Sequence, residues 1–243
     1  MTLLLVTTPG SVDARGRDFW NRSGTEALQE GREKRLWVLV YFPAAGQERD
    51  HPEVRKFAVP TKLSEELIGA RVRAAELTAL REIFELTDRD AVDILPALFL
   101  VAPHGKLIHG WTRRWQSQDV LGKFQSGRRA LRRTYKWIER RLGRAERTLK
   151  LGRSSEAIKL LEEGRSKMRP GFPQEARVKD LADRLRARAN NALLETLARE
   201  GLVTDAGLLR GLDQLVTTYP LEEFVARVER EKKRIHERTV GGE

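Results

Sequence analysis

The chain offers few side chains that could do chemistry. Among its 243 residues there is no cysteine, which excludes disulfides, thiolate nucleophiles and cysteine-ligated metal sites. No histidine has a partner at a metal-ligand or catalytic spacing, and the four are His51, His104, His109 and His236. No serine lies in a nucleophile motif, and the neighbouring carboxylates Asp88 and Asp90 fall in an expected loop with no third group to assist them. We therefore expect a protein without catalytic residues, metal or cofactor.

Basic side chains are concentrated in one segment. The net charge is +11, yet residues 1–110 hold 15 Lys+Arg against 16 Asp+Glu, whereas residues 111–153 hold 14 basic and 3 acidic residues. A local excess of this kind predicts an acidic partner, such as nucleic acid, an anionic membrane surface or an acidic protein face. The candidate residues for binding such a polyanion are Arg128, Arg129, Arg132, Arg133, Lys136, Arg140, Arg141 and Arg144.

The same segment also permits a purely structural interpretation. An apolar stripe with steps of four and three residues predicts a connecting helix over residues 127–151, formed by Leu131, Tyr135, Ile138, Leu142, Ala145 and Leu149. The arginines then cover its remaining faces and would form a solvated surface. Trp111, Trp115 and Trp137 could stack on bases, but we expect Trp111 and Trp115 to pack at the end of a hairpin. Both interpretations stay open on the sequence.

The elements before this helix predict an α/β domain. An amphipathic pattern over residues 18–32, closed by Gly31, indicates a helix, and LWVLVYF at residues 36–42 indicates a strand that is covered on both faces. Further along we expect a strand at 67–72, a helix at 76–86, and a hairpin of strands 98–101 and 107–111. Together they form a mixed sheet with helices on its faces. Residues 1–17 are expected to be a leading strand or tail.

These motifs resemble the thioredoxin fold. WVLVYF followed by a loop and helix, and later a proline directly before an apolar strand and a glycine turn (ILPALFLVAPHGKLIHG), cover residues 18–125. The resemblance, nearest to a bacterial thioredoxin-like group, implies that the Leu95–Pro96 bond is cis and faces the loop after the first long strand. Proline tolerates a cis bond far better than other residues and suits the first position of a strand.

The loop itself departs from the redox-active family members. The two positions of the usual Cys-x-x-Cys pair fall near Gln47 and Asp50, which cannot form a disulfide, so thiol oxidoreductase activity is excluded. Thioredoxin-like proteins hold extended peptides beside this proline, which implies strand addition at this place. The candidate peptide- or client-binding residues are Gly46, Gln47, Glu48, Asp50, Leu95 and Pro96. The alternative is a decayed site kept only as a surface loop.

The last part of the chain predicts stacked helical hairpins. Gly152, Ala157 and Pro170 are matched 49 or 50 residues later by Gly201, Ala206 and Pro220. Small residues let antiparallel helices approach closely, and the prolines end helices. The pattern resembles tetratricopeptide-like repeats, although its period exceeds 34 residues. The predicted domains are therefore a thioredoxin-like domain at 18–126, a basic connecting helix at 127–151 and a helical domain at 152–243.

This architecture resembles chaperedoxins, which join a thioredoxin-like domain lacking the cysteine pair to tetratricopeptide-like repeats. The resemblance implies a redox-inactive scaffold that binds protein partners or clients. The alternatives are a glutathione transferase-like enzyme, whose family also joins a thioredoxin fold to helices, and a nucleic-acid-associated basic scaffold. No apolar stretch reaches the roughly 18 residues of a membrane span. We expect a cytoplasmic protein, with export through an incomplete N-terminal signal as an alternative.

Overall fold

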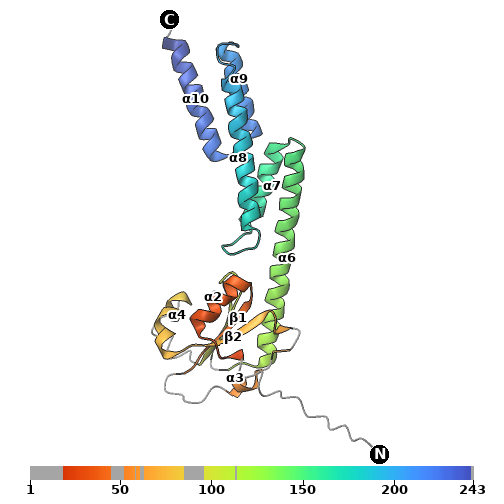
Figure 1. Cartoon of the computed structure of the whole chain (residues 1–243), viewed down its shortest axis with the longest axis vertical. Coiled ribbons are helices and arrows are strands. Elements are labelled where there is room, and N and C mark those ends of the chain that lie inside the picture. Colours follow the sequence, from red (N-terminus) through yellow and green to blue (C-terminus); the bar gives the residue numbers. More distant parts are fainter. Residues whose placement is uncertain are drawn as a thin grey trace, which may run out of the picture. The chain divides into compact units, whose positions relative to one another are not determined.

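The computed structural model describes residues 19–44, 52–57, 59–60, 63–84, 96–112 and 114–241. The chain divides into two compact units, Met1–Leu131 and Arg132–Glu243. The first unit contains a sheet with helices, and the second is built from helices (Figure 1).

A mixed sheet forms the centre of the first unit. Its four strands lie in the order β2-β1-β3-β4. The bounds are Trp37–Phe42 for β1, Leu67–Arg71 for β2, Ala97–Val101 for β3 and Leu107–Thr112 for β4. β2 runs parallel to β1, whereas β3 runs antiparallel to β1 and β4 antiparallel to β3. The predicted mixed α/β sheet with a terminal hairpin is therefore confirmed.

Strand β1 is buried on both faces, as its composition predicted. Val38, Val40 and Phe42 point into a cluster with α2 (Gly24–Lys34) and with α4 (Leu77–Ile83), which follows η2 (Ala74–Glu76). Trp37, Leu39 and Tyr41 point into the opposite cluster, with α3 (Pro52–Lys56) and the start of α6 (Ser117–Lys150). This alternation follows from the period of two in a strand, and it requires helices on both faces of the sheet.

The predicted bounds of the first helix were wrong. Helix α2 begins only at Gly24, where Ser23 and Glu26 form a reciprocal capping box, and it ends at Lys34 before Arg35, which has a φ of 57°. Gly31 lies inside the helix and does not end it. A Cβ atom on Gly31 would lie 2.4 Å from Cγ2 of Val38, so the glycine is required where the helix approaches β1.

The second unit contains the end of α6 and four further helices. They are α7 (Ser154–Ser166), α8 (Glu175–Leu197), α9 (Asp205–Thr218) and α10 (Glu222–Gly241). The connecting helix predicted over 127–151 thus begins earlier, at Ser117, as part of α6. The stripe predicted on it is confirmed as a buried seam in its second half, formed by Ile138, Leu142, Ala145 and Leu149.

The predicted helical hairpins agree in part with the structure. Gly152 and Gly201 precede α7 and α9 with φ of 77° and 83°, and Pro170 and Pro220 follow the ends of these helices. Ala157 is fully buried, but Ala206 is exposed, so its predicted role in close helix packing was wrong. In α9 the close approach falls instead at Gly211, where a Cβ atom would lie 3.2 Å from Cγ2 of Thr196 in α8.

Two glycines in helices provide a test of this packing. Gly31→Ala should lower the free energy of unfolding by about 1–3 kcal/mol, because the new methyl group would overlap Val38. Gly122→Ala in α6, which would meet nothing within 4 Å, should raise it by roughly 0.5–1 kcal/mol through helix propensity. Urea unfolding of both variants measures the difference. Shifts of the same sign would refute the close contact at Gly31.

Candidate functional site

Most of the predicted peptide site lies outside the described residues. This holds for Gly46, Gln47, Glu48, Asp50 and Leu95, and therefore for the Leu95–Pro96 bond. Pro96 is half-buried and directly precedes β3, whose first residue, Ala97, pairs with Phe42 at the end of β1. Pro96 therefore lies at the end of the sheet where β1 ends.

A pocket of about 460 Å³ opens at this same end of the sheet. The parallel strands β1 and β2 both end here, and Pro43 follows one strand while Arg71, Val72 and Arg73 follow or end the other. The described residues that line the pocket are Trp20, Asn21, Arg22, Pro43, Arg71, Val72 and Arg73. Sequence analysis did not anticipate this site. The available signal was a pair of arginines directly after a strand that is paired in parallel.

Glu76 fixes the backbone beside this pocket. Its carboxylate accepts hydrogen bonds from the N–H groups of Gly24 at 3.3 Å, Thr25 at 3.0 Å and Arg73 at 3.1 Å. Burial alone would raise the pKa of Glu76, but the hydrogen bonds from Thr25 and Arg73 outweigh it and hold the pKa below its usual value. The charged carboxylate thus joins the start of α2 to the turn after β2.

The predicted polyanion-binding residues all lie on α6. Ion pairs join Arg128 to Glu66, Arg141 to Glu163 at 3.2 Å and Arg144 to Glu156 at 3.6 Å. Five further residues of the set are exposed, and Nε of Arg129 donates to the carbonyl of Gln125. Those exposed residues are Arg129, Arg132, Arg133, Lys136 and Arg140.

A basic face runs along α6 in the second unit, and we define it by Arg132, Arg133, Lys136, Arg140, Arg144 and Arg147. Their spacing of three and four residues places them on one side of the helix, about half a turn away from the buried seam. The acidic residues in this part of α6 lie elsewhere. Glu139 and Glu146 both pair with Arg177 of α8. The hydrogen bond from Arg177 to Glu146 lowers the pKa of Glu146. No carboxylate of α6 belongs to the basic face, and Glu156 of α7 reaches it at Arg144.

The aromatic residues considered for base stacking are engaged in packing. Trp115 is buried in the sheet core with Trp111 packed against it, as predicted. The ring of Tyr135 lies 4.9 Å from that of Phe172, and the ring of Trp137 is contacted by Arg141 and Lys167 at 5.2 and 5.3 Å. These contacts stabilise the helical unit and leave charge as the principal chemistry of the basic face.

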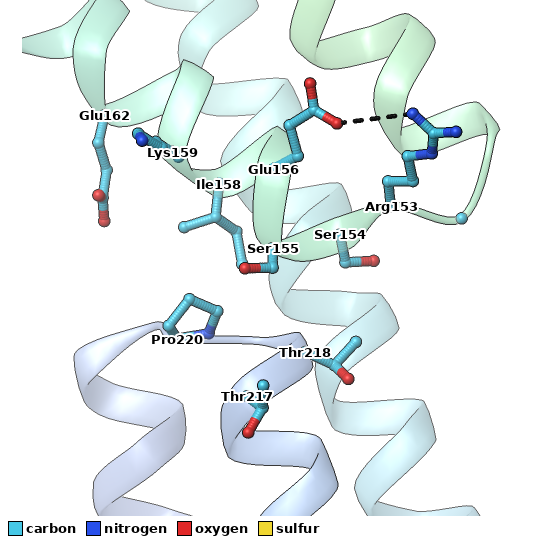
Figure 2. Close-up of a pocket in the computed structure, with 11 residues that line it drawn as sticks. Arg153, Ser154, Ser155, Glu156, Ile158, Lys159, Glu162, Thr217, Thr218 and Pro220 are labelled. Atoms are coloured by element: carbon cyan, nitrogen blue, oxygen red, sulfur yellow. Dashed lines mark ion pairs between the residues drawn. The ribbon is translucent and has the colours of Figure 1, made fainter.

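A second hollow, of about 750 Å³, lies in the helical unit (Figure 2). It is bounded by the first half of α7 and by the end of α9 with Pro220. Its charges balance, because Arg153 and Lys159 are accompanied by Glu156 and Glu162, and Arg153 pairs with Glu156 at 3.9 Å. The hydroxyls of Thr217 and Thr218 donate to carbonyls of their own helix. The hollow therefore favours no particular class of ligand.

Within the described residues, no group of three or more His, Asp and Glu side chains is arranged to hold a metal ion. No helix in that part of the chain is both long and apolar enough to cross a membrane. A scan against protein-family models found no match, and a search of curated proteins found none either. The chain is thus defined by its architecture, a four-stranded mixed α/β unit and a helical unit.

Replacing Glu76 tests its structural role. Glu76→Ala should lower the free energy of unfolding by about 1–3 kcal/mol, because three backbone N–H groups lose their acceptor. Glu65→Ala, at an exposed carboxylate before β2, is the matched control and should change little. Chemical unfolding at neutral pH gives both values, and equal values would contradict the role of Glu76.

The same carboxylate predicts a pH dependence. Since its pKa is lower in the folded chain, its charge stabilises the fold fully above the ordinary value of 4.5, and this contribution is lost as the pH falls through the folded pKa. The difference in stability between the unmodified chain and Glu76→Gln should therefore be constant near neutrality and shrink in acid. A difference that grows on acidification would contradict the lowered pKa.

Proposed function

We propose that the protein is a redox-inactive, thioredoxin-like interaction scaffold that binds an acidic protein partner and catalyses no reaction. Support for the fold comes from the parallel β1/β2 pair, the antiparallel β3/β4 hairpin that follows Pro96, and the helices on both faces of the sheet. Support for the absence of redox chemistry comes from the lack of cysteine.

The basic face of α6 is the observation that carries the proposal. It contains like charges four residues apart at Arg132/Lys136, Lys136/Arg140 and Arg140/Arg144. Each such pair destabilises a helix by roughly 0.2–0.5 kcal/mol. An anionic partner offsets this repulsion. A face that needed only to be soluble would be more stable with basic and acidic residues interspersed.

The extent of the basic face suits a macromolecular partner. From Arg132 to Arg147 the helix rises by ~22 Å, which is longer than a small ligand. Arginine also forms bidentate hydrogen bonds with carboxylates. An acidic protein segment is favoured over single-stranded nucleic acid, because Trp115, Tyr135 and Trp137 are occupied by packing and do not form a platform for bases.

Nucleic acid is the second candidate, supported by the density of arginine, since phosphate contacts alone suffice for binding without sequence preference. One set of variants distinguishes the two. The first replaces Arg132, Arg133, Lys136 and Arg140 together by Gln, and the matched control replaces four exposed basic residues outside α6 by Gln, namely Lys179, Arg199, Arg210 and Arg230.

Binding of poly-glutamate and of a single-stranded RNA should be measured with both variants at the same salt concentration. We expect the α6 variant to lose about tenfold or more in affinity for poly-glutamate and the control to lose much less, since both remove the same charge but only one removes the basic face. Equal losses would refute a localised site. Binding of RNA but not of poly-glutamate would favour the second candidate.

A chaperone-like role makes a separate prediction. The full chain should suppress the aggregation of a thermally unfolding model enzyme at a near-stoichiometric ratio, because a scaffold that binds clients must compete with their self-association. Light scattering measures the effect, and serum albumin at equal mass is the control. No suppression by a folded preparation would remove client binding from the proposal and leave a scaffold for folded partners.

A further inference from the structure

The pocket at the carboxyl ends of β1 and β2 has the features of a binding site for a small molecule. Ligands of open α/β sheets bind outside the carboxyl ends of parallel strands, where loops diverge from a rigid sheet. The volume of about 460 Å³ falls within the range of small-molecule pockets and is far larger than an inorganic ion needs. The pocket lies in the first unit and is separate from the basic face of α6.

Three arginines from two chain segments line this pocket. Arg22 comes from the segment before α2, which is bound to the edge of β2. Its backbone forms a parallel bridge with Ala70, and its carbonyl accepts a hydrogen bond from the N–H of Arg71 at 3.1 Å. Arg71 and Arg73 come from the end of β2 and the turn after it. The sheet edge thus fixes the backbone of Arg22 and Arg71, and the carboxylate of Glu76 holds the backbone of Arg73.

Among the described residues, three carboxylates lie near the backbone or side chains of this region, and one of them, Glu30, pairs with Arg22 itself. Glu30 accepts from Nε of Arg22 at 2.7 Å, and it also pairs with Lys34. Glu76 accepts from backbone N–H groups, and Glu26 takes part in the capping box with Ser23. None of them is among the described residues that line the pocket. The start of α2 is already capped, so the positive character of the pocket comes from guanidinium groups.

A small apolar wall, which is the lesser part of the lining surface, is formed by Trp20, Pro43 and Val72. The indole N–H of Trp20 donates to the carbonyl of Val54 at 3.1 Å, and its ring packs at 5.7 Å from the ring of Phe57. Val72 is buried, and its N–H donates to the carbonyl of Tyr41 at 2.9 Å. These contacts hold the wall in place before any ligand binds, which lowers the entropic cost of binding.

We propose that this pocket binds a small organic phosphate, with the phosphate group held by Arg22, Arg71 and Arg73 and a compact apolar body resting against Trp20 and Pro43. A phosphate monoester is favoured over a carboxylate because it carries about −1.5 to −2 charges at neutral pH and three oxygens that match several guanidinium forks. Asn21, whose side chain is a polar amide, also lines the pocket.

Phenyl phosphate is the probe for this proposal, with inorganic phosphate and benzoate as comparison ligands. Calorimetric titration of the full chain should give the tightest binding for phenyl phosphate, because only it supplies both the dianion and the apolar body. In a ¹H–¹⁵N correlation NMR spectrum, the indole N–H of Trp20 should show the largest change in chemical shift on addition of phenyl phosphate. Undetectable binding of phenyl phosphate at millimolar concentration, or equal binding of benzoate, would overturn the proposal.

Arg71→Gln and Arg73→Gln locate the site. Each should weaken phenyl phosphate binding by about tenfold, the effect of losing one charge-assisted contact. Arg55→Gln, at an exposed arginine of α3 outside the pocket, is the matched control and should leave binding unchanged. Both pocket variants keep the backbone hydrogen bond from the N–H of residue 73 to Glu76, so we expect them to fold. Equal weakening by all three variants would indicate charge attraction alone and overturn the proposal, while leaving the role of α6 untouched.

Discussion

The burial of β1 on both of its faces is the constraint from which the first unit follows. Each of its six side chains is at most 4% exposed, so no part of the strand can face water. Helices must cover both faces, and strands must pair with both edges, which β2 and β3 do. Polar side chains can gather around this strand only where it ends. The pocket and Pro96 accordingly both lie at the end that follows Phe42.

In the second unit the corresponding constraint is the division of α6 into two opposite sides. The buried seam consists of apolar side chains, among them Ile138, Leu142 and Ala145. The acidic residues Glu139 and Glu146 of α6 lie at the flank of the helix, where both pair with Arg177. Burial and ion pairing together thus leave the side of α6 opposite the seam without an acidic residue of α6, and Glu156 of α7 reaches that side at Arg144.

Local patterns were sufficient to predict the strands, the hairpin and the buried seam, because each depends on residues that are near in sequence. The bounds of α2 were missed because Gly31 has two interpretations in a sequence, a helix end or a close contact, and only the position of Val38 decides between them. The pocket was missed for a similar reason. It forms when pairing in the sheet brings Arg22 beside Arg71, and nothing in either segment alone indicates that pairing. The ion pairs of Arg128 and Arg141 likewise depend on distant partners.

The three hydrogen bonds of Glu76 also bear on how the first unit opens. They join the first N–H groups of α2 to the turn after β2, while the backbone bridge between Arg22 and Ala70 joins the same two segments a few residues away. Because both contacts join the same two segments, neither segment can unfold without breaking its contacts with the other. Helix α2 and strand β2 therefore belong to one cooperative unit in native-state hydrogen exchange, although about thirty residues of chain lie between them.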